Sequence, residues 1–178
     1  MRGEEMGEYG ELARKARERD PKAFAGLYEM VYQDMYHMAL YTLRNPQDAE
    51  DAVSETVADA YAGIHNLRDA EAFRGWIFKI LSNKCKRRLK EYLNKPVELG
   101  EELTDSVSLE MYTPDPDENM QVREAFFRLG EEERLIVAMK VFGGYQSKEI
   151  GAILHKSHNT VRSKLSRALE KMQRYLDE

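Results

Sequence analysis

Basic and polar side chains are concentrated in the segment 159–172, where the sequence reads NTVRSKLSRALEKM. Its cations are Arg162, Lys164, Arg167 and Lys171. Guanidinium and ammonium groups donate hydrogen bonds to phosphates and guanine edges of DNA, asparagine pairs with adenine, and hydroxyl groups contact phosphate oxygens. A run of charge is also the ordinary solvated face of a surface helix, so the segment alone does not decide between these interpretations.

Apolar residues at helical spacing predict the elements that position these side chains. We expect a short helix from Ser147 to Leu154, a tight break at His155-Lys156, and a second helix capped by Ser157. Two helices joined in this way form a helix-turn-helix, whose second helix can enter the major groove. The apolar stripe of that second helix is Val161, Leu165, Ala168, Leu169 and Met172. The residues able to face outward are His158, Asn159, Thr160, Arg162, Ser163, Lys164 and Arg167.

A second charged region lies in the N-terminal half, on two further predicted helices. The first begins at Asn45-Pro46, and its predicted buried residues are Ala49, Val53, Val57, Ala60, Tyr61 and Ile64. Its other face carries Glu50, Asp51, Ser54, Glu55 and Asp59. The next helix, from about Glu71 to about Leu93, changes from apolar, AFRGWIFKIL, to basic, SNKCKRRLKEYLNK. Taken alone, the acidic face fits a solvated surface, and the aromatic residues of the next helix fit core packing.

The remaining helices complete an all-α fold. Asp20-Pro21 opens a helix whose apolar stripe is Phe24, Leu27, Tyr28, Val31, Met35, Met38 and Thr42. Two more are expected from Asp117 to about Arg128 and from Glu131 to Phe142, the latter ended by Gly143-Gly144. Few prolines and glycines, and little β-branched alternation, agree with a helical chain.

Composition limits the class of protein. The 178 residues are 42% hydrophobic and 33% charged, with a net charge of −5, so contacts with phosphates must come from local patches. The single cysteine, Cys85, cannot form an internal disulfide and fits a reducing compartment. No apolar run approaches the roughly 18 residues that span a bilayer, and no signal peptide opens the sequence. We therefore expect a cytoplasmic protein with no membrane contact of its own.

The charge changes sign between the two halves. From Pro96 to Glu118 the chain has eight acidic residues and no lysine or arginine, and Pro114-Asp115-Pro116 forbids a continuous helix. The sequence therefore predicts two small helical domains, at 1–95 and 117–178, joined by an acidic flexible linker at 96–116.

These motifs together resemble a known family. The stretch EIGAILHKSHNTVRSKLSRAL resembles the C-terminal helix-turn-helix of the extracytoplasmic-function (group 4) sigma factors of bacterial RNA polymerase. The stretches NPQDAEDAVSETVADAYAGI and FRGWIFKILSNKCKRRL resemble the first conserved domain of the same family. The resemblance extends from about Asp20 to Leu176, with the two domains in the family's order.

The resemblance implies roles for individual residues. A surface that binds the β′ clamp helices of core polymerase is implied for Asp48, Asp51, Ser54, Glu55 and Asp59. Binding of the −10 element is implied for Leu67, Arg68, Asp69, Asn83, Lys84, Arg87 and Arg88. The outward residues of the helix-turn-helix, His158, Asn159, Thr160, Arg162, Ser163, Lys164 and Arg167, are implied to read the −35 element. The linker matches the segment that threads the polymerase active-site channel.

The sequence departs from the family pattern at four positions. Ser54 replaces a usual glutamine, Gly151 a usual alanine, His155 a common glycine and Gly130 a common proline. These departures leave the general mechanism in place, but they affect the expected promoter sequence.

The implied function is promoter-specific transcription initiation, with core polymerase (including its β flap), promoter DNA and potentially an anti-sigma factor as partners. We expect no cofactor and no metal, and we find no catalytic pattern that would make the chain an enzyme. The alternative is a stand-alone helix-turn-helix regulator whose N-terminal domain senses a ligand or mediates dimerisation. A further hypothesis is that the linker or the opposite domain covers the basic patches of the free protein.

Overall fold

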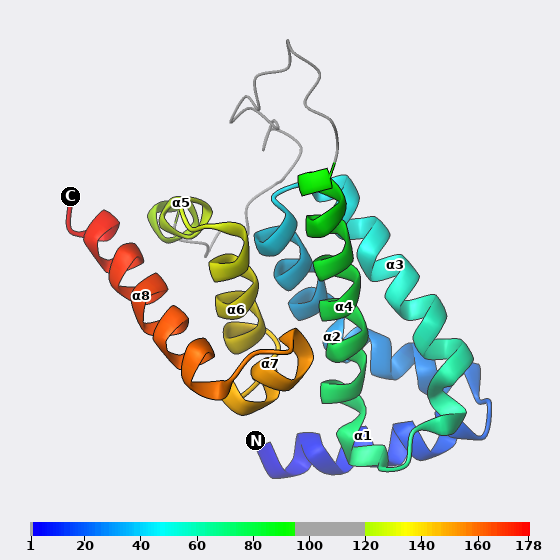
Figure 1. Cartoon of the computed structure of the whole chain (residues 1–178). Helices are drawn as coiled ribbons and strands as arrows, with labels where there is room; N and C mark the ends of the chain where they lie inside the picture. The colour runs from blue at the N-terminus through cyan, green and yellow to red at the C-terminus, as the bar shows by residue number, and fades with distance from the viewer. Residues whose placement is uncertain (1, 95–119) are drawn as a thin grey trace.

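The computed structural model describes residues 2–94 and 120–178, and within them the regular elements are all helical (Figure 1). The α-helices are α1 (Arg2–Arg17), α2 (Pro21–Leu43), α3 (Pro46–Gly63), α4 (Phe73–Asn94), α5 (Met120–Phe127), α6 (Glu131–Val141), α7 (Ser147–Leu154) and α8 (His158–Leu176). Two 3-10 turns, η1 (Ile64–Asn66) and η2 (Ala70–Ala72), connect α3 to α4. The all-α prediction is confirmed. The predicted linker at 96–116 and the predicted helix start at Asp117 lie outside the described residues.

None of the helices in the described ranges is both long enough and apolar enough to cross a bilayer.

The starts of α2 and α3 follow from two capping residues that precede prolines. Asp20 accepts hydrogen bonds from two backbone N–H groups of the first turn of α2, at 2.9 and 3.2 Å. Asn45 accepts one from the N–H of Asp48 at 3.1 Å. Pro21 and Pro46 occupy the first helical positions, where a missing N–H leaves no hydrogen bond unmade. Both predicted helix starts are therefore confirmed.

Helix α1 is an element that the sequence analysis did not predict. It packs on α2 and on the turns η1 and η2 through small residues, and Ala13 and Ala16 are almost fully buried. Its backbone comes so close to η2 that a Cβ atom on Gly10 would lie 3.3 Å from Cγ of Glu71. Because alanine and glycine form this contact, α1 lacks the stripe of large apolar residues that marks an amphipathic helix.

The N-terminal half is a bundle in which α2 packs against α3 and α4. Six of the seven residues of the predicted α2 stripe are buried, and Tyr28 is half-buried. Phe73 and Phe78 of α4 are fully buried, as the core interpretation expected. The prediction that Tyr61 is buried is wrong, because its side chain is 51% exposed and only its ring contacts Phe24 edge-on. Cys85 is buried, which raises the pKa of its thiol to about 12.

The C-terminal half packs directly on the N-terminal half. Helix α6 contacts both α2 and α4, and α8 crosses α5, α6 and α7 on the far side (Figure 1). The ring of Tyr41 in α2 lies 4.8 Å from that of Phe126 and 5.3 Å from that of Phe142. The buried residues of the two halves thus form one continuous hydrophobic cluster.

Candidate nucleic-acid interface

The turn between α7 and α8 has the tight geometry of a helix-turn-helix. Ser157 caps α8 by accepting a hydrogen bond from the N–H of Thr160 at 3.1 Å, as predicted. His155 ends α7 in the left-handed conformation, with φ of 55°. A Cβ atom on Gly151 would lie 2.6 Å from the carbonyl oxygen of Lys156. The turn therefore passes too close to α7 for alanine at position 151, which explains this departure from the family pattern.

One face of α8 is free to meet a ligand. Six of the seven predicted −35 residues are exposed on it: His158, Asn159, Thr160, Arg162, Ser163 and Arg167. The opposite domain thus leaves this patch uncovered. An open groove along this face is also lined by Lys140 of α6 and Ser147 of α7. The sequence analysis missed these two residues because each lies on another helix, and only the fold places them beside α8.

The predicted stripe of α8 is correct except at one position. Val161 and Ala168 are fully buried, and Leu165 and Met172 are partly buried against the core. Leu169 is 49% exposed and lines the groove, so its predicted burial is wrong. It lies one residue beyond Ala168, at the edge of the stripe, where the curvature of the packed surface leaves it in solvent.

Lys164 differs from the other predicted −35 residues because it faces α6. Its ammonium group pairs with Glu132, which also pairs with Lys156 at 2.8 Å, while Lys171 pairs with Glu133 at 2.6 Å. Burial raises the pKa of the Glu132 carboxyl, but hydrogen bonds from Lys156 and Lys164 outweigh burial and hold this pKa below its ordinary value. Lysines of the turn and of α8 thus attach the recognition helix to α6.

We predict that Glu132→Gln lowers the free energy of unfolding at pH 7. A carboxyl whose pKa is depressed in the folded state contributes stability above its unfolded pKa, about 4.5, and this contribution is lost as the pH falls further. The difference from the parent protein should therefore shrink below pH 4.5 in urea denaturation series. Glu124→Gln, which alters an exposed carboxyl of α5, is the control. A difference that stays constant with pH would contradict the assignment.

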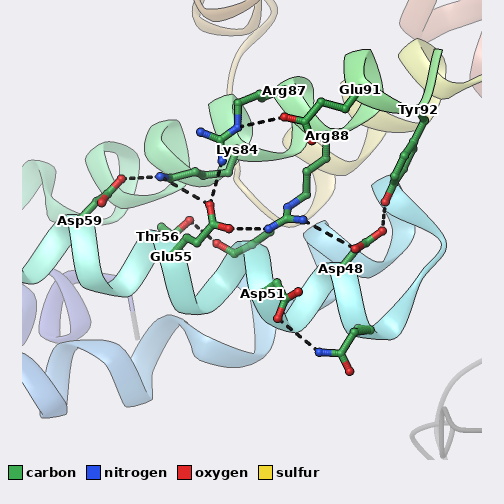
Figure 2. Close-up of polar contacts among 12 residues, drawn as sticks. Asp48, Asp51, Glu55, Thr56, Asp59, Lys84, Arg87, Arg88, Glu91 and Tyr92 are labelled. Carbon is green, nitrogen blue, oxygen red and sulfur yellow. Dashed lines mark hydrogen bonds and ion pairs between the residues drawn. The ribbon is translucent and has the colours of Figure 1, made fainter. Parts of the chain in front are cut away.

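A network of ion pairs joins α3 to α4, with Glu55 at its centre (Figure 2). Its carboxylate lies 2.6 Å from Nη2 of Arg88 and 2.9 Å from Nη2 of Arg87. Lys84 lies 3.8 Å from Glu55 and 2.5 Å from Asp59. The side chains of Lys84 and Arg88 are only 16% and 15% exposed. Three predicted DNA-binding cations therefore pair with two predicted polymerase-binding acids.

The network continues to the start of α3, where Asp48 lies 3.6 Å from Arg88 and accepts a hydrogen bond from the hydroxyl of Tyr92 (Figure 2). The other two predicted polymerase-binding residues, Asp51 and Ser54, are exposed. Asp51 accepts a hydrogen bond only from Gln47 of its own helix among the contacts in Figure 2, at 3.3 Å. The predicted acidic surface thus divides into residues that pair with α4 and residues that face solvent.

Comparison with known proteins identifies both halves. The family model of sigma-70 region 2 matches residues 27–92, and that of sigma-70 region 4 matches residues 119–172. Together the two matches cover about two thirds of the chain, in the order of the family. The chain belongs to the sigma-70 family. It is an RNA polymerase sigma factor that directs promoter-specific transcription initiation.

Similar sigma factors and structures support this membership. The ECF RNA polymerase sigma factor SigM of Mycobacterium tuberculosis is 27% identical over 88% of this chain and 79% of its own length. SigV of Bacillus subtilis is 27% identical over 79% and 82%. The structure of CnrH in complex with the cytosolic domain of CnrY shares the fold, with a TM-score of 0.64 at 20% identity over 96% of this chain and 97% of CnrH. So does the sigma factor RpoE of Bartonella quintana in complex with the anti-sigma factor NepR, with a TM-score of 0.64 at 19% identity over 88% and 98%.

In this sigma factor, the residues expected at the −10 element occupy different environments. Arg68 and Asn83 are exposed. Asp69 is exposed too, and it caps η2 by accepting a hydrogen bond from the N–H of Glu71 at 3.0 Å. Leu67 is 6% exposed and packs in the core, so only its backbone is available to a DNA base.

Three other cations of α4 lie away from the network with α3. Within the described residues, Lys79, Lys86 and Lys90 have no ion pair or hydrogen bond through their side chains. Spacings of seven and four residues place them along one side of the helix with Asn83. In the sigma-70 region 2 domain, this stripe is therefore the basic surface of α4 that is free to bind phosphates.

Proposed function

We propose that this sigma factor belongs to the extracytoplasmic-function group, group 4, and acts with core polymerase in the cytoplasm without catalysing a reaction itself. Region 2, at 1–95, would bind polymerase and the −10 element, and region 4, at 117–178, would bind the −35 element. The exposed reading face of α8, combined with family matches in both halves, carries this proposal. Run-off transcription with core polymerase tests it, and no promoter-dependent product would contradict it.

The proposed polymerase contact is the solvent-facing side of α3. Asp51 and Ser54 are exposed there, together with Gln47 and Glu50. Asp48, Glu55 and Asp59 belong to the same proposed surface, but their carboxylates pair with α4 in the free protein. Their first role would therefore be to hold α4 beside the polymerase-facing side of α3.

We predict that Asp51→Lys weakens binding to core polymerase about tenfold or more, since a like charge at a complementary interface costs several kcal/mol. Glu29→Lys makes the same charge change at an exposed acid of α2 and is expected to bind as the parent does. Affinity is measured by fluorescence anisotropy, and circular dichroism should show that both variants fold. Equal affinities of the two variants for core polymerase would remove Asp51 from the interface.

The proposed −10 contact combines the turn between α3 and α4 with the free stripe of α4. Arg68 and Asn83 are exposed beside this turn and would hold an unstacked base, since polar groups recognise the edges of such a base. Lys86 and Lys90 would follow the adjacent phosphates. Lys84, Arg87 and Arg88 remain part of the proposed site, with Arg87, at 54% exposed, the most accessible of them.

An anti-sigma factor is a proposed further partner. Two structures of similar fold are complexes of this kind, one with the cytosolic domain of CnrY and one with the anti-sigma factor NepR. A small apolar cleft between α4 and α6, lined by Leu89, Leu93, Leu135 and Leu154, adds a surface of suitable chemistry. Loss of promoter-specific transcription on adding a co-purifying protein would support this partner.

A further inference from the structure

The contact between the two halves contains two arginines that cap helices reciprocally. Arg134 of α6 is 6% exposed, and its Nε atom lies 3.4 Å from the carbonyl oxygen of Thr42 in the last turn of α2. Arg74 of α4 donates in the opposite direction, from Nη2 to the carbonyl oxygen of Phe142 at the end of α6, at 2.7 Å. The last carbonyl groups of a helix have no partner within the helix and carry its negative end. Each half therefore supplies a cation to a helix terminus of the other.

The neighbouring groups hold the two arginines in place. Asp34 of α2 lies 2.8 Å from Arg74, and the carbonyl of Leu129 accepts a second hydrogen bond from Arg134 at 2.7 Å. Burial lowers the pKa of Arg134 to about 10, so its side chain remains a cation at neutral pH. The hydroxyl of Tyr145, which precedes α7, donates to the carbonyl of Gly75 in α4. Four polar contacts thus accompany the aromatic packing of Tyr41.

The character of this interface suits a contact that forms and breaks. Arg74 is 32% exposed and Asp34 46% exposed, so water can replace their hydrogen bonds when the halves separate. Interfaces between domains that move are mixed in this way, whereas permanent ones resemble a domain core. Only the cluster around Tyr41 and Arg134 must be newly hydrated on opening.

The compact arrangement is too small for the proposed promoter contacts. The −10 and −35 elements lie about 25 base pairs apart, or roughly 85 Å at 3.4 Å per base pair. A compact chain of this length has a diameter of about 40 Å. A rigid protein of this shape could contact one element at a time. The chain between Asn94 and Met120 permits separation, because each extended residue spans about 3.3 Å.

We infer that the free protein rests in a closed conformation, held by the reciprocal caps of Arg74 and Arg134 and by the Tyr145–Gly75 contact, and that the halves must separate before initiation. The need for separation rests on the proposed binding of both promoter elements. The exposed side of α3 and the reading face of α8 both remain accessible in the closed conformation. Polymerase can therefore bind the closed protein first, and its two separate binding surfaces can then draw the halves apart.

A reversible cross-link tests this inference. The rings of His37 in α2 and Phe142 lie 5.8 Å apart, so the variant His37→Cys/Phe142→Cys places two thiols across the interface. A short bis-methanethiosulfonate reagent joins them, and dithiothreitol releases them. Cys85 is buried and reacts slowly, because the thiolate is the reactive species. We expect the cross-linked variant to give at least tenfold less run-off transcript with core polymerase, and the reduced variant to regain parental activity.

The rate of cross-linking in the free protein tests closure independently of transcription. The pair at 37 and 142 should react at least tenfold faster than the pair His37→Cys/Asp177→Cys, whose second position lies at the exposed end of α8. Tyr145→Phe/Arg74→Gln should slow the reaction at least threefold, whereas Arg128→Gln, which removes a stacking contact with Tyr175 inside the C-terminal half, should not. Equal rates for the two pairs would overturn the closed conformation. Full activity of the cross-linked protein would overturn the need to open.

If neither the parent nor the reduced variant transcribes with core polymerase, the proposed function fails instead. The cross-linking rates then still decide whether the free protein is closed.

Discussion

Replacing Arg88 by methionine is expected to lower the free energy of unfolding by about 2–3 kcal/mol. Removing one member of a buried ion pair costs about 3–5 kcal/mol, and the partial exposure of its partners reduces this figure. The side chain of Arg88 is 15% exposed, and it lies between Asp48 and Glu55. Methionine keeps most of the side-chain volume and leaves both carboxylates without this partner. Urea denaturation of the full chain measures the effect.

Lys90→Met is the matched control for this prediction. Lys90 lies on the same helix within the same basic run, but it is exposed and has no partner among the described residues. Its replacement should change stability by less than about 0.5 kcal/mol. It should instead weaken binding of single-stranded −10 DNA by holoenzyme and reduce the salt dependence of that binding. A stable Arg88→Met variant that lost only DNA binding would show that Arg88 contacts DNA rather than α3.

The prediction has a second part that isolates the pair itself. In a double-mutant cycle with Glu55→Gln, the effect of Arg88→Met should be smaller than in the parent, because the two side chains share one interaction. Additive effects of the two substitutions would show that the 2.6 Å contact does not stabilise the fold.

The sequence contained enough local information to predict most helices. Capping side chains before prolines determined the starts of α2 and α3, and Ser157 determined the start of α8. These signals act within one turn of chain, so they are visible without the fold. Helix α1 was missed because it buries Ala13 and Ala16 at a close helix contact instead of a stripe of large residues.

The division of the charged residues could not be predicted in the same way. Helical periodicity relates positions within α4, but it does not give the rotation of α4 relative to α3. One signal was available, since Lys84 and Arg88 continue at four-residue spacing the row of Trp76 and Ile80, which packs on the core. The basic run therefore contains a row that faces α3 and a free row with Lys86 and Lys90.

The contact between the halves depends on residues far apart in sequence. Arg134 reaches a carbonyl 92 residues away, and Arg74 one 68 residues away. A backbone carbonyl gives no sign in the sequence that it accepts a hydrogen bond from a distant arginine. This is why the predicted two-domain organisation contained no prediction of how the domains meet.

Replacing Arg162 by alanine is expected to weaken binding to a −35 duplex about ten- to a hundredfold, the loss of about 1–3 kcal/mol that accompanies a contact to a base edge. Arg162 is exposed near the start of α8, where side chains of a recognition helix reach the bases. Arg167 lies further along the same groove, and its Nε donates to the carbonyl of Ser163 at 3.2 Å, which directs its guanidinium group outward. We expect Arg167→Ala to have a similar effect if it contacts a base.

Arg174 offers a matched control for these two arginines. Its Nε donates to the carbonyl of Glu170 at 3.4 Å, so it has the same local geometry as Arg167, but it lies near the far end of α8, outside the groove. Arg174→Ala should therefore bind the −35 duplex within about twofold of the parent, apart from a small effect of net charge. Fluorescence anisotropy on matched and scrambled duplexes, at several salt concentrations, measures all three variants.

The salt series separates the two kinds of contact that arginine makes with DNA. A contact to a base edge gives a loss on the matched duplex that exceeds the loss on the scrambled one, because only the matched sequence presents the right acceptors. A contact to phosphate lowers affinity on both duplexes alike and reduces the salt slope by about one. Lys164→Ala should behave differently from both, since Lys164 pairs with Glu132 and its loss should reduce stability more than sequence preference. If Arg162→Ala and Arg167→Ala both bind the matched duplex as tightly as Arg174→Ala does, this face of α8 does not read the −35 element.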